Sequence, residues 1–499
     1  MKKSFCLLLV LAVLLPCFVA CNPTEGPASH EHVFVHWRTT TPATCEADGE
    51  ETATCSCGKT KTRPVAGGHD YTLTELDISE NPTVERAGTF YCANCKTTLV
   101  RSITPQDIGM PIVTLTGSLE GISKENKVKV SFDYQAEDQS FTCEATLKWQ
   151  GATSIDYPKK NYNVQFFEED GSKKKVELVD GWGKESKYCM KANWTDFSQA
   201  RNVVSAKLYG DVARSARRTD EFSSLINGGA IDGYPIVVYL NGQFLGLYTM
   251  NTPKDKWLFG MEDDPTLRQA IFMAEQWHDS VSLRVPVSYD FVSTNWELEH
   301  CSTEEDPTIG TNWSVDSFNR MMNFVQWQGG DYFKENLSSY INVDRAIDVL
   351  IFTWVMCGID NTSKNILWIT YDGTVWAPCV YDMDSTWGMW WDASHLNTAG
   401  EVKSWSNSSV NVLFQKLRMY YADEILARYA ELREGPLSDK SIEKKFTDFF
   451  ESIPDPIYLA EEQRWADRPG LWMNHEQQIL SFAKEHLDIL DDKFVKGTW

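Results

Sequence analysis

The chain has 499 residues, of which 42% are hydrophobic and 12% aromatic, and its formal net charge at pH 7 is −23. This composition favours a packed globular protein over a disordered one, and the length predicts two or three domains. The acidic balance argues against nucleic acid as a partner, because binding to phosphates requires a basic patch. The 19 tryptophans fit core packing or, as the alternative, aromatic platforms for contact with glycans.

The N-terminal residues 1–20 predict a lipoprotein signal peptide. Two lysines precede an apolar run, and Ala20 stands directly before Cys21 in "FVAC", which resembles a bacterial lipobox. Residues 21–30 are polar and are predicted to form a tether. We expect a protein that is secreted across the cytoplasmic membrane and held by lipid on Cys21, at the cell surface or facing the periplasm. The alternative is an ordinary signal peptide with a chance cysteine.

Residues 31–103 predict a small Cys-rich β module that acts as a spacer or docking unit. The segment is rich in Thr, Gly and Cys, and two short cysteine pairs lie in turns after strand-like stretches. Two such knuckles suit a tetrahedral zinc ribbon, although "CSC" departs from the stronger C-x-x-C spacing. Disulfides or free thiols are the alternatives. The predicted zinc ligands are Cys55, Cys57, Cys92 and Cys95, with His69 as a further ligand.

From about residue 108 the pattern predicts an α+β domain. Stretches that alternate apolar and polar residues predict strands, and an Asn-Gly pair at 241–242 predicts a hairpin. Helical spacing of apolar residues appears first in 195–216 and then dominates the second half of the domain. The strand-rich half therefore precedes the helix-rich half. The insert at 262–313 is interpreted as a variable loop region near a cleft.

A group of polar residues follows the apolar stretch "AIDVLIFTWVMC". Asp360 and Asn365 are five residues apart, and Asp382 and Asp384 end a predicted hairpin. Phosphoryl transfer requires one carboxylate at the acceptor hydroxyl, and a carboxylate with an amide to hold Mg²⁺. No His-Arg pair precedes Asp360 and no Phe-Gly pair follows Asp382. On spacing alone, helix capping and turn formation remain the alternative.

Five stretches in order carry a family resemblance: "LKWQGATSIDYPKKNYNVQF", "KYCMKANWTDFSQARNVVSAKLYGD", "YPIVVYLNGQFLGLYTM", "GIDNTSKNILWITYDG" and "VYDMDSTWG". From about residue 108 to the C-terminus the chain resembles the CotH family of atypical, kinase-like proteins, named for a spore-coat protein. The resemblance implies a two-lobed fold, with a β-rich lobe at about 108–255 and a helical lobe at about 256–499.

The resemblance also implies a role for each matching residue. Asp360 would be the catalytic aspartate, and Gly388 would close the turn after the metal-binding pair. Asn365, Asp382 and Asp384 would hold Mg²⁺, and Lys160, Lys191 and Arg201 are the residues expected to bind the phosphates of ATP. A solvated side chain is the alternative for each lysine. Gln150 and Asn251 depart from the family pattern, at positions where an arginine and a glutamate are usual.

The expected function is ATP- and Mg²⁺-dependent phosphorylation of Ser or Thr in secreted or envelope proteins. ATP is scarce outside the cytoplasmic membrane, which is the main objection. The first alternative is a surface binding or assembly lipoprotein with a degenerate kinase-like fold. A metal-dependent hydrolase is a third interpretation, and it lacks the clustered histidines that such sites recruit.

Overall fold

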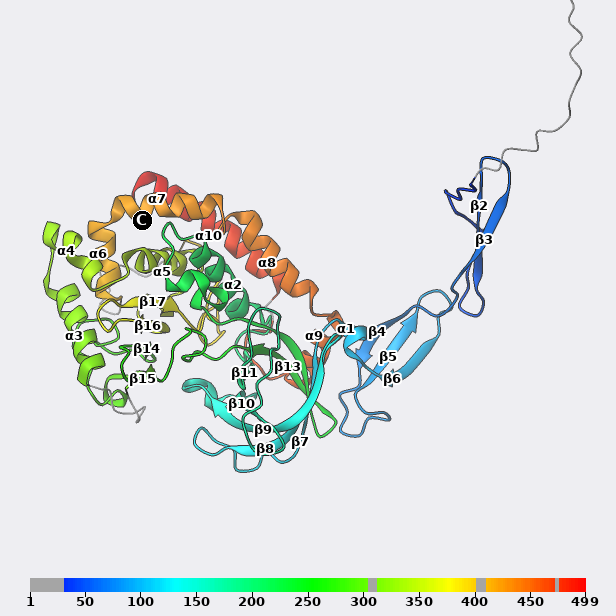
Figure 1. Cartoon of the computed structure of the whole chain (residues 1–499), viewed down its shortest axis with the longest axis horizontal. Helices are drawn as coiled ribbons and strands as arrows, with labels where there is room; N and C mark the ends of the chain where they lie inside the picture. The colour runs from blue at the N-terminus through cyan, green and yellow to red at the C-terminus, as the bar shows by residue number, and fades with distance from the viewer. Residues whose placement is uncertain (1–30, 304–311, 401–409, 472–474) are drawn as a thin grey trace, which may run out of the picture. The chain divides into compact units, whose positions relative to one another are not determined.

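The computed structural model describes residues 31–303, 312–400, 410–471 and 475–499 (Figure 1). The predicted signal peptide, the tether and Cys21 lie outside these residues. The chain divides into two compact units. Unit 1 comprises residues up to Tyr71 together with Cys92–Thr97, and unit 2 comprises Thr72–Tyr91 and Thr98–Trp499. None of the described helices is long and apolar enough to cross a membrane.

Unit 1 contains an antiparallel sheet of three strands in the order β1-β2-β3. The strands are β1 (Arg38–Thr41), β2 (Gly49–Thr54) and β3 (Thr60–Val65). Three further strands form a small sheet in the order β4-β5-β6, with β4 (Tyr71–Leu76), β5 (Ala87–Cys92) and β6 (Thr98–Ser102). The short helix α1 (Pro105–Ile108) follows, and its capping residue Thr104 interacts with Asp107.

A closed barrel of seven strands, in the order β10-β11-β13-β12-β7-β8-β9, forms the first half of the main domain. Alternate residues of these strands point inward and are buried, among them Phe132, Phe166 and Met250, as period-2 patterning requires. β12 pairs with β7 in parallel, and the other described pairs are antiparallel. The strands are β7 (Ile112–Thr116), β8 (Val128–Gln135), β9 (Ser140–Gln150), β10 (Asn161–Phe167), β11 (Lys187–Lys191), β12 (Gly233–Leu240) and β13 (Gln243–Asn251).

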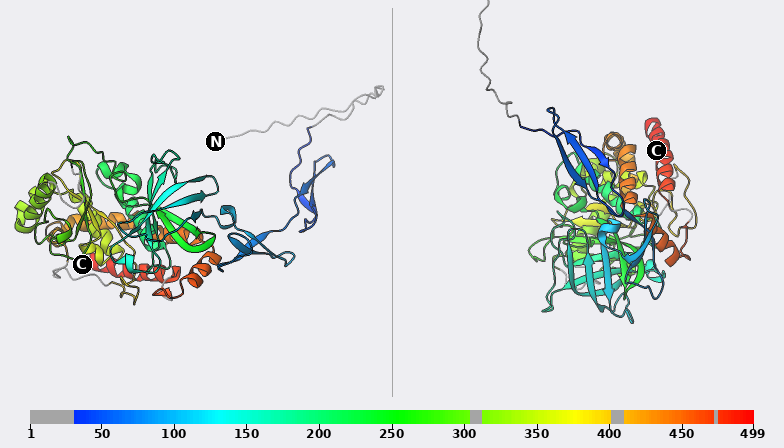
Figure 2. Two further views of the ribbon diagram at one scale, coloured as in Figure 1. Left: turned by 90° about the horizontal axis from the view of Figure 1, so that it is seen from below. Right: turned by 90° about the vertical axis from the view of Figure 1, so that its right-hand side faces the viewer.

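The main domain contains another sheet, called the second sheet below, in the half that was expected to be helical. Its antiparallel strands have the order β15-β14-β16-β17, with β14 (Ala270–Ala274), β15 (Trp296–Cys301), β16 (Ile366–Thr370) and β17 (Ala377–Val380). The rings of Phe272, Phe318 and Trp376 pack against one another at centroid distances of 4.9 to 5.2 Å, so the sheet has an aromatic core of its own. Both sheets can be followed in Figures 1 and 2.

The helices surround the second sheet and contact the barrel. α2 (Ala200–Arg214) contacts α5 (Val343–Val355), which is buried along nearly its whole length and contacts β17. α8 (Asp439–Glu451) and α10 (Glu476–Lys496) contact each other (Figure 1). The remaining helices are α3 (Asn312–Trp327), α4 (Gly330–Asn336), α6 (Val412–Tyr420), α7 (Ala422–Glu434) and α9 (Asp455–Arg464).

The α+β class is confirmed, and two details differ from expectation. The β-rich part closes into a barrel, since β7 pairs with both β8 and β12 and no edge is left between them. The insert at 262–313 was interpreted as a loop region, but it supplies β14 and β15 to the second sheet. The apolar alternation in these short strands is masked because β14 is buried on both faces.

Candidate active site

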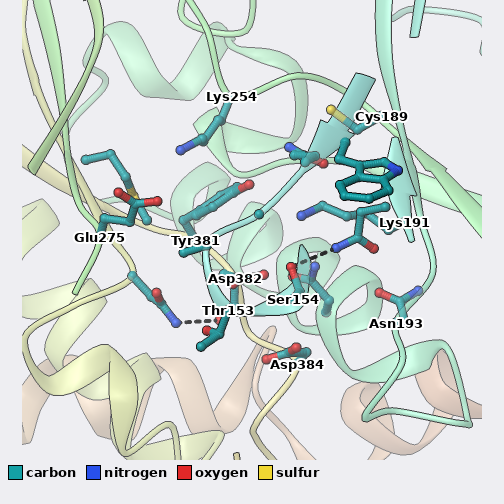
Figure 3. A pocket seen from close by; sticks show the side chains of 18 of the residues that line it. Thr153, Ser154, Cys189, Lys191, Asn193, Lys254, Glu275, Tyr381, Asp382 and Asp384 are labelled. Atoms are coloured by element: carbon teal, nitrogen blue, oxygen red, sulfur yellow. Dashed lines mark hydrogen bonds between the residues drawn. The ribbon is translucent and has the colours of Figure 1, made fainter. Parts of the chain in front are cut away.

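A cavity of about 300 Å³ lies between the barrel and the second sheet. Barrel strands β9, β10 and β11 supply one side, and the ends of β14, β15 and β17 supply another. Asp360, Asn365, Asp382, Asp384 and Lys191 all line it, so the fold brings together five of the residues predicted from sequence. Figure 3 shows Lys191 and Lys254 near the Tyr381 ring, with Asp382 just below the ring and Asp384 further down the view.

The loop after β9 borders the cavity with polar groups. Gly151 has a φ of 118°, and a Cβ there would lie 1.9 Å from Ser154 Oγ, so the turn requires glycine. Asn161 donates from Nδ2 to Ser154 Oγ at 3.2 Å. Gln150 Oε1 is buried and has no hydrogen-bond partner among the described residues. A buried acceptor without a partner is costly, so this oxygen suits a ligand that donates a hydrogen bond.

The segment after α5 places Asp360 and Asn365 at the cavity. Asp360 begins a short 3-10 helix, Asp360–Thr362, and forms an ion pair with Lys364 at 3.0 Å. Asn365 has a φ of 57° and donates from Nδ2 to the carbonyl of Asp382 at 3.1 Å. Asn361, which sequence analysis did not single out, is buried and donates to the carbonyl of Tyr381 at 2.9 Å. These bonds hold the two chain segments in register.

Asp382 and Asp384 follow β17 in a strained turn. Asp382 has a φ of 49°, which is uncommon outside glycine. Burial and repulsion from Asp382 raise the pKa of Asp384 to about 7. Among the described carboxylates, Asp360, Asp382 and Asp384 do not bring three oxygen atoms within 4.8 Å of one another. Carboxylate and amide oxygens are the ligands that Mg²⁺ prefers, and Asp382, Asp384 and Asn365 supply such oxygens at the cavity.

Gly388 occupies the place predicted for the end of this turn. Its φ is 91°, and a Cβ there would lie 2.6 Å from the Phe482 ring of α10. The main chain of the same turn is fixed from the other side, because the amide of Met383 donates to Asn202 Oδ1 on α2 at 3.1 Å. Two helices far apart in the sequence thus position the turn that carries Asp382 and Asp384.

The structure distinguishes Lys191 from Lys160, the two lysines that were equally good candidates for phosphate contact on sequence alone. Lys191 lines the cavity, and its Nζ lies 5.8 Å from the centroid of the Tyr381 ring. Burial alone would lower the pKa of Lys191, but attraction to Tyr381 and Asp382 outweighs burial and raises it. Lys160 instead donates to the carbonyl of Ile155 at 2.6 Å and lies over the Trp149 ring. Lys191 is therefore the lysine available to an anionic ligand.

Two further residues named from sequence, Arg201 and Asn251, do not line the cavity. Arg201 is fully buried, pairs with Asp196 at 2.6 Å, and donates from Nε to the carbonyl of Thr386 at 3.0 Å. It therefore positions the turn after Asp384 rather than lining the cavity. Asn251 is also buried away from the cavity, so close to Gly233 that a Cβ on Gly233 would lie 2.3 Å from Asn251 Oδ1.

Several charged residues of the cavity were not identified from sequence, and Lys254, Glu297 and Glu299 form one group among them. Lys254 lies 4.9 Å from the centroid of the Tyr381 ring and forms ion pairs with Glu297, at 2.8 Å, and with Glu299. Burial and repulsion from Glu297 raise the pKa of Glu299 to about 8, although Lys254 opposes the shift. The stretch "WELEHC" contains the pattern that points to this pair, because Glu297 and Glu299 are two residues apart and such residues share one face of a strand.

The cysteines predicted to share one zinc ion fall into two separate groups within unit 1. Cys92 and Cys95 lie with Cys45 and His69, whereas Cys55 and Cys57 lie with His32. The single ribbon that joins Cys55 and Cys57 to Cys92 and Cys95 is therefore not the arrangement found. No disulfide bond joins the described cysteines.

One protein family matches the chain: the sequence model described as CotH kinase protein covers residues 147–490. This is more than two thirds of the chain, begins within β9 and contains the cavity residues discussed above. No curated protein matches the chain.

Proposed function

The chain belongs to the CotH kinase protein family, and from this premise we propose that it is an ATP- and Mg²⁺-dependent kinase. Its acceptors would be Ser or Thr hydroxyl groups of secreted or envelope proteins. The observation that carries the proposal is the convergence of Asp360, Asn365, Asp382 and Asp384 with Lys191 in one cavity. Phosphoryl transfer is catalysed mainly by positioning and charge stabilisation, and this group supplies both.

The donor set fits a nucleotide with a divalent cation. Asp382, Asp384 and the Asn365 amide are the oxygen ligands that would hold Mg²⁺, which neutralises phosphate charge when bound. Lys191 would contact the phosphates, since it lines the cavity and attraction to Tyr381 and Asp382 raises its pKa and keeps it charged. The unpartnered Gln150 Oε1 suits a hydrogen-bond donor of the ligand. A volume of about 300 Å³ is within the range of small-molecule sites.

Asp360 would act on the acceptor. Its carboxylate orients the hydroxyl group and takes its proton as the hydroxyl oxygen bonds to the γ-phosphorus. The bond from that phosphorus to the β–γ bridging oxygen breaks, and ADP leaves. Lys364, at 3.0 Å from Asp360, compensates the carboxylate's charge in this structure. The acceptor must approach along the side of the cavity on which Asp360 lies.

The location of the protein is also part of the proposal. The lipobox-like "FVAC" supports secretion and a lipid anchor on Cys21, which would place acceptors in the envelope or outside the cell. The kinase could then act only where ATP is supplied. Residues 1–30 are not among those that the structure describes, so the anchor rests on sequence.

One observation favours a second function, a non-catalytic binding or assembly protein. Asp360 is engaged by Lys364, and the three aspartates do not form a preassembled group of oxygen ligands among the described residues. A degenerate kinase-like fold would retain the cavity without catalysis there, and its exposed surface would bind protein or glycan partners.

Transfer of labelled phosphate separates the two functions. We would incubate the chain with γ-labelled ATP, Mg²⁺ and acidic or basic acceptor proteins, and compare Asp360→Asn and Asp382→Asn with the exposed control Asp488→Asn. The kinase proposal is supported if the wild type and the control transfer phosphate and both cavity variants transfer it at least about 10²-fold more slowly. If the wild type transfers no phosphate and binds no ATP in a Mg²⁺-dependent way, the kinase proposal fails.

A further inference from the structure

Unit 1 holds a compact group of four metal-ligand side chains that the proposed kinase function does not use. The Sγ atoms of Cys45, Cys92 and Cys95 and one ring nitrogen of His69 all lie within 4.8 Å of one another. Three thiolates and one imidazole form a complete ligand set for a structural zinc site. All four residues belong to unit 1, although Cys45 and Cys92 are 47 positions apart in the chain.

The distances between these atoms match a tetrahedral site. Zn–S bonds of about 2.3 Å at tetrahedral angles place two sulfur ligands about 3.8 Å apart. Cys45 Sγ and Cys92 Sγ are 3.7 Å apart, close to this value. His69 Nδ1 and Cys95 Sγ are 3.2 Å apart, slightly closer than the about 3.5 Å expected for a nitrogen and a sulfur on one zinc ion. A disulfide would require a sulfur–sulfur distance of about 2.05 Å. The atoms therefore surround a space of the size of one zinc ion.

The turn that carries two of the ligands has the geometry of a metal knuckle. In "CANCK", the amide of Lys96 donates to the carbonyl of Cys92 at 2.8 Å, and Lys96 has a φ of 63°. This turn directs Cys92 Sγ and Cys95 Sγ to the same side. The turn at "CSCG" is built alike, because the amide of Gly58 donates to Cys55 at 2.8 Å and Gly58 has a φ of 88°.

Unit 1 has almost no apolar core that would otherwise stabilise it. Among its described residues, four are buried: Gly49, Ala53, Cys55 and Cys92. Two of these four are cysteines of the two metal-ligand groups. Small units that bury so little apolar surface need disulfides or a metal to fold, and no disulfide joins the described cysteines.

We propose that Cys45, His69, Cys92 and Cys95 bind one zinc ion, and that this ion holds unit 1 folded. The ion ties the segment around Cys45 and His69 to the distant turn 92–97, because each half contributes two ligands. The group of His32, Cys55 and Cys57 offers three ligands among the described residues and serves as an internal comparison. The proposal does not depend on kinase activity.

Metal content and cobalt spectra of the purified chain test the site. Dialysis of the wild type against metal-free buffer should leave about one tightly bound zinc ion per chain. Cobalt substitution should give the visible bands of a tetrahedral ion and a near-ultraviolet thiolate-to-cobalt transition. Cys45→Ser and Cys95→Ser should each lower the affinity by more than the 10–100-fold that is typical of outer-shell changes. Cys143→Ser, in the barrel, is the matched control and should leave metal binding unchanged.

Folding of the unit gives an independent readout. A strong chelator should expose residues 31–71 to limited proteolysis while the barrel stays resistant, and added zinc should reverse the effect. Cys95→His keeps four ligands and should retain the metal, which separates loss of a ligand from general misfolding. The proposal is overturned by an absence of tightly bound metal, by a disulfide between Cys45 and Cys92, or by metal loss in Cys57→Ser but not in Cys45→Ser.

Discussion

The side-chain amide of Asn365 donates to the main-chain carbonyl of Asp382 at 3.1 Å, and both residues have positive φ angles, 57° and 49°. The bond joins the segment after α5 to the segment after β17. Two conformations that cost energy in isolation persist only where surrounding structure holds them. At this cavity the hydrogen bond helps to hold both conformations, and so keeps Asn365 and Asp382 together in the cavity lining.

Substitution of Asn365 tests this arrangement. Asn365→Gly accepts the positive φ but removes the amide, and we expect Mg²⁺-dependent ATP affinity to fall about 10-fold or more, since a hydrogen bond and a ligand oxygen are lost. Calorimetric titration with ATP at fixed Mg²⁺ measures the change. Asn361→Gly, which removes the neighbouring amide that donates to Tyr381, provides the comparison. If Asn365→Gly binds as the wild type does, the amide has no role in ligand binding.

Lys191 and Lys160 provide a variant and its matched control for phosphate contact. Lys191→Met should weaken ATP binding about 10- to 100-fold, because a buried charge-assisted contact is worth about 1.5–3 kcal/mol. Lys160→Met should bind ATP like the wild type, since Lys160 donates to Ile155 outside the cavity. Equal losses in both variants would contradict the assignment of Lys191. Thermal unfolding of each variant checks that the barrel is intact.

Arg201 is expected to affect stability rather than nucleotide contact. Arg201→Met leaves the carboxylate of Asp196 buried and unpaired, and we expect the free energy of unfolding to fall by about 3–5 kcal/mol. The double variant Asp196→Asn with Arg201→Met removes that charge and should recover part of the loss. Urea unfolding measures both changes. A large loss of ATP affinity in folded Arg201→Met, with unchanged stability, would instead make Arg201 a ligand contact.

Glu299 predicts a pH dependence of stability. Its pKa in the folded chain is about 8, against about 4.3 in an unfolded chain. Between about pH 4.3 and about pH 8 the Glu299 carboxyl keeps its proton in the folded state and releases it in the unfolded state. The stability gained by keeping Glu299 protonated is therefore complete below about pH 4.3 and is lost as the pH rises through about 8.

The wild type should therefore lose stability relative to Glu299→Gln between pH 6 and pH 8, by at most about 1.4 kcal/mol per pH unit. Urea unfolding at a series of pH values measures the difference. Glu275→Gln, another glutamate of the cavity, is the control. Parallel pH profiles for the wild type and Glu299→Gln would show that Glu299 is ionised throughout this range.

Local sequence patterns were sufficient for the elements and for part of the site. The Asn241–Gly242 pair predicted the hairpin of β12 and β13, and helical spacing predicted α2 and α5. The order of Asp360, Asn365, Asp382 and Asp384, carried by the family resemblance, identified residues that do line one cavity. Turn chemistry and periodicity are encoded over a few residues, so they can be read without the fold.

Tertiary structure alone decided which equivalent residues face the cavity. Lys160 and Lys191 look alike in sequence, and their separation depends on the barrel register that turns Lys191 toward Tyr381. The strands of the 262–313 insert pair with each other and with β16, and only this pairing decides that Glu297 and Glu299 face the same cavity as Lys191. The partners of Cys45 and Cys92 were hidden for the same reason: contacts between distant segments depend on how the whole chain packs, which short-range patterns do not encode.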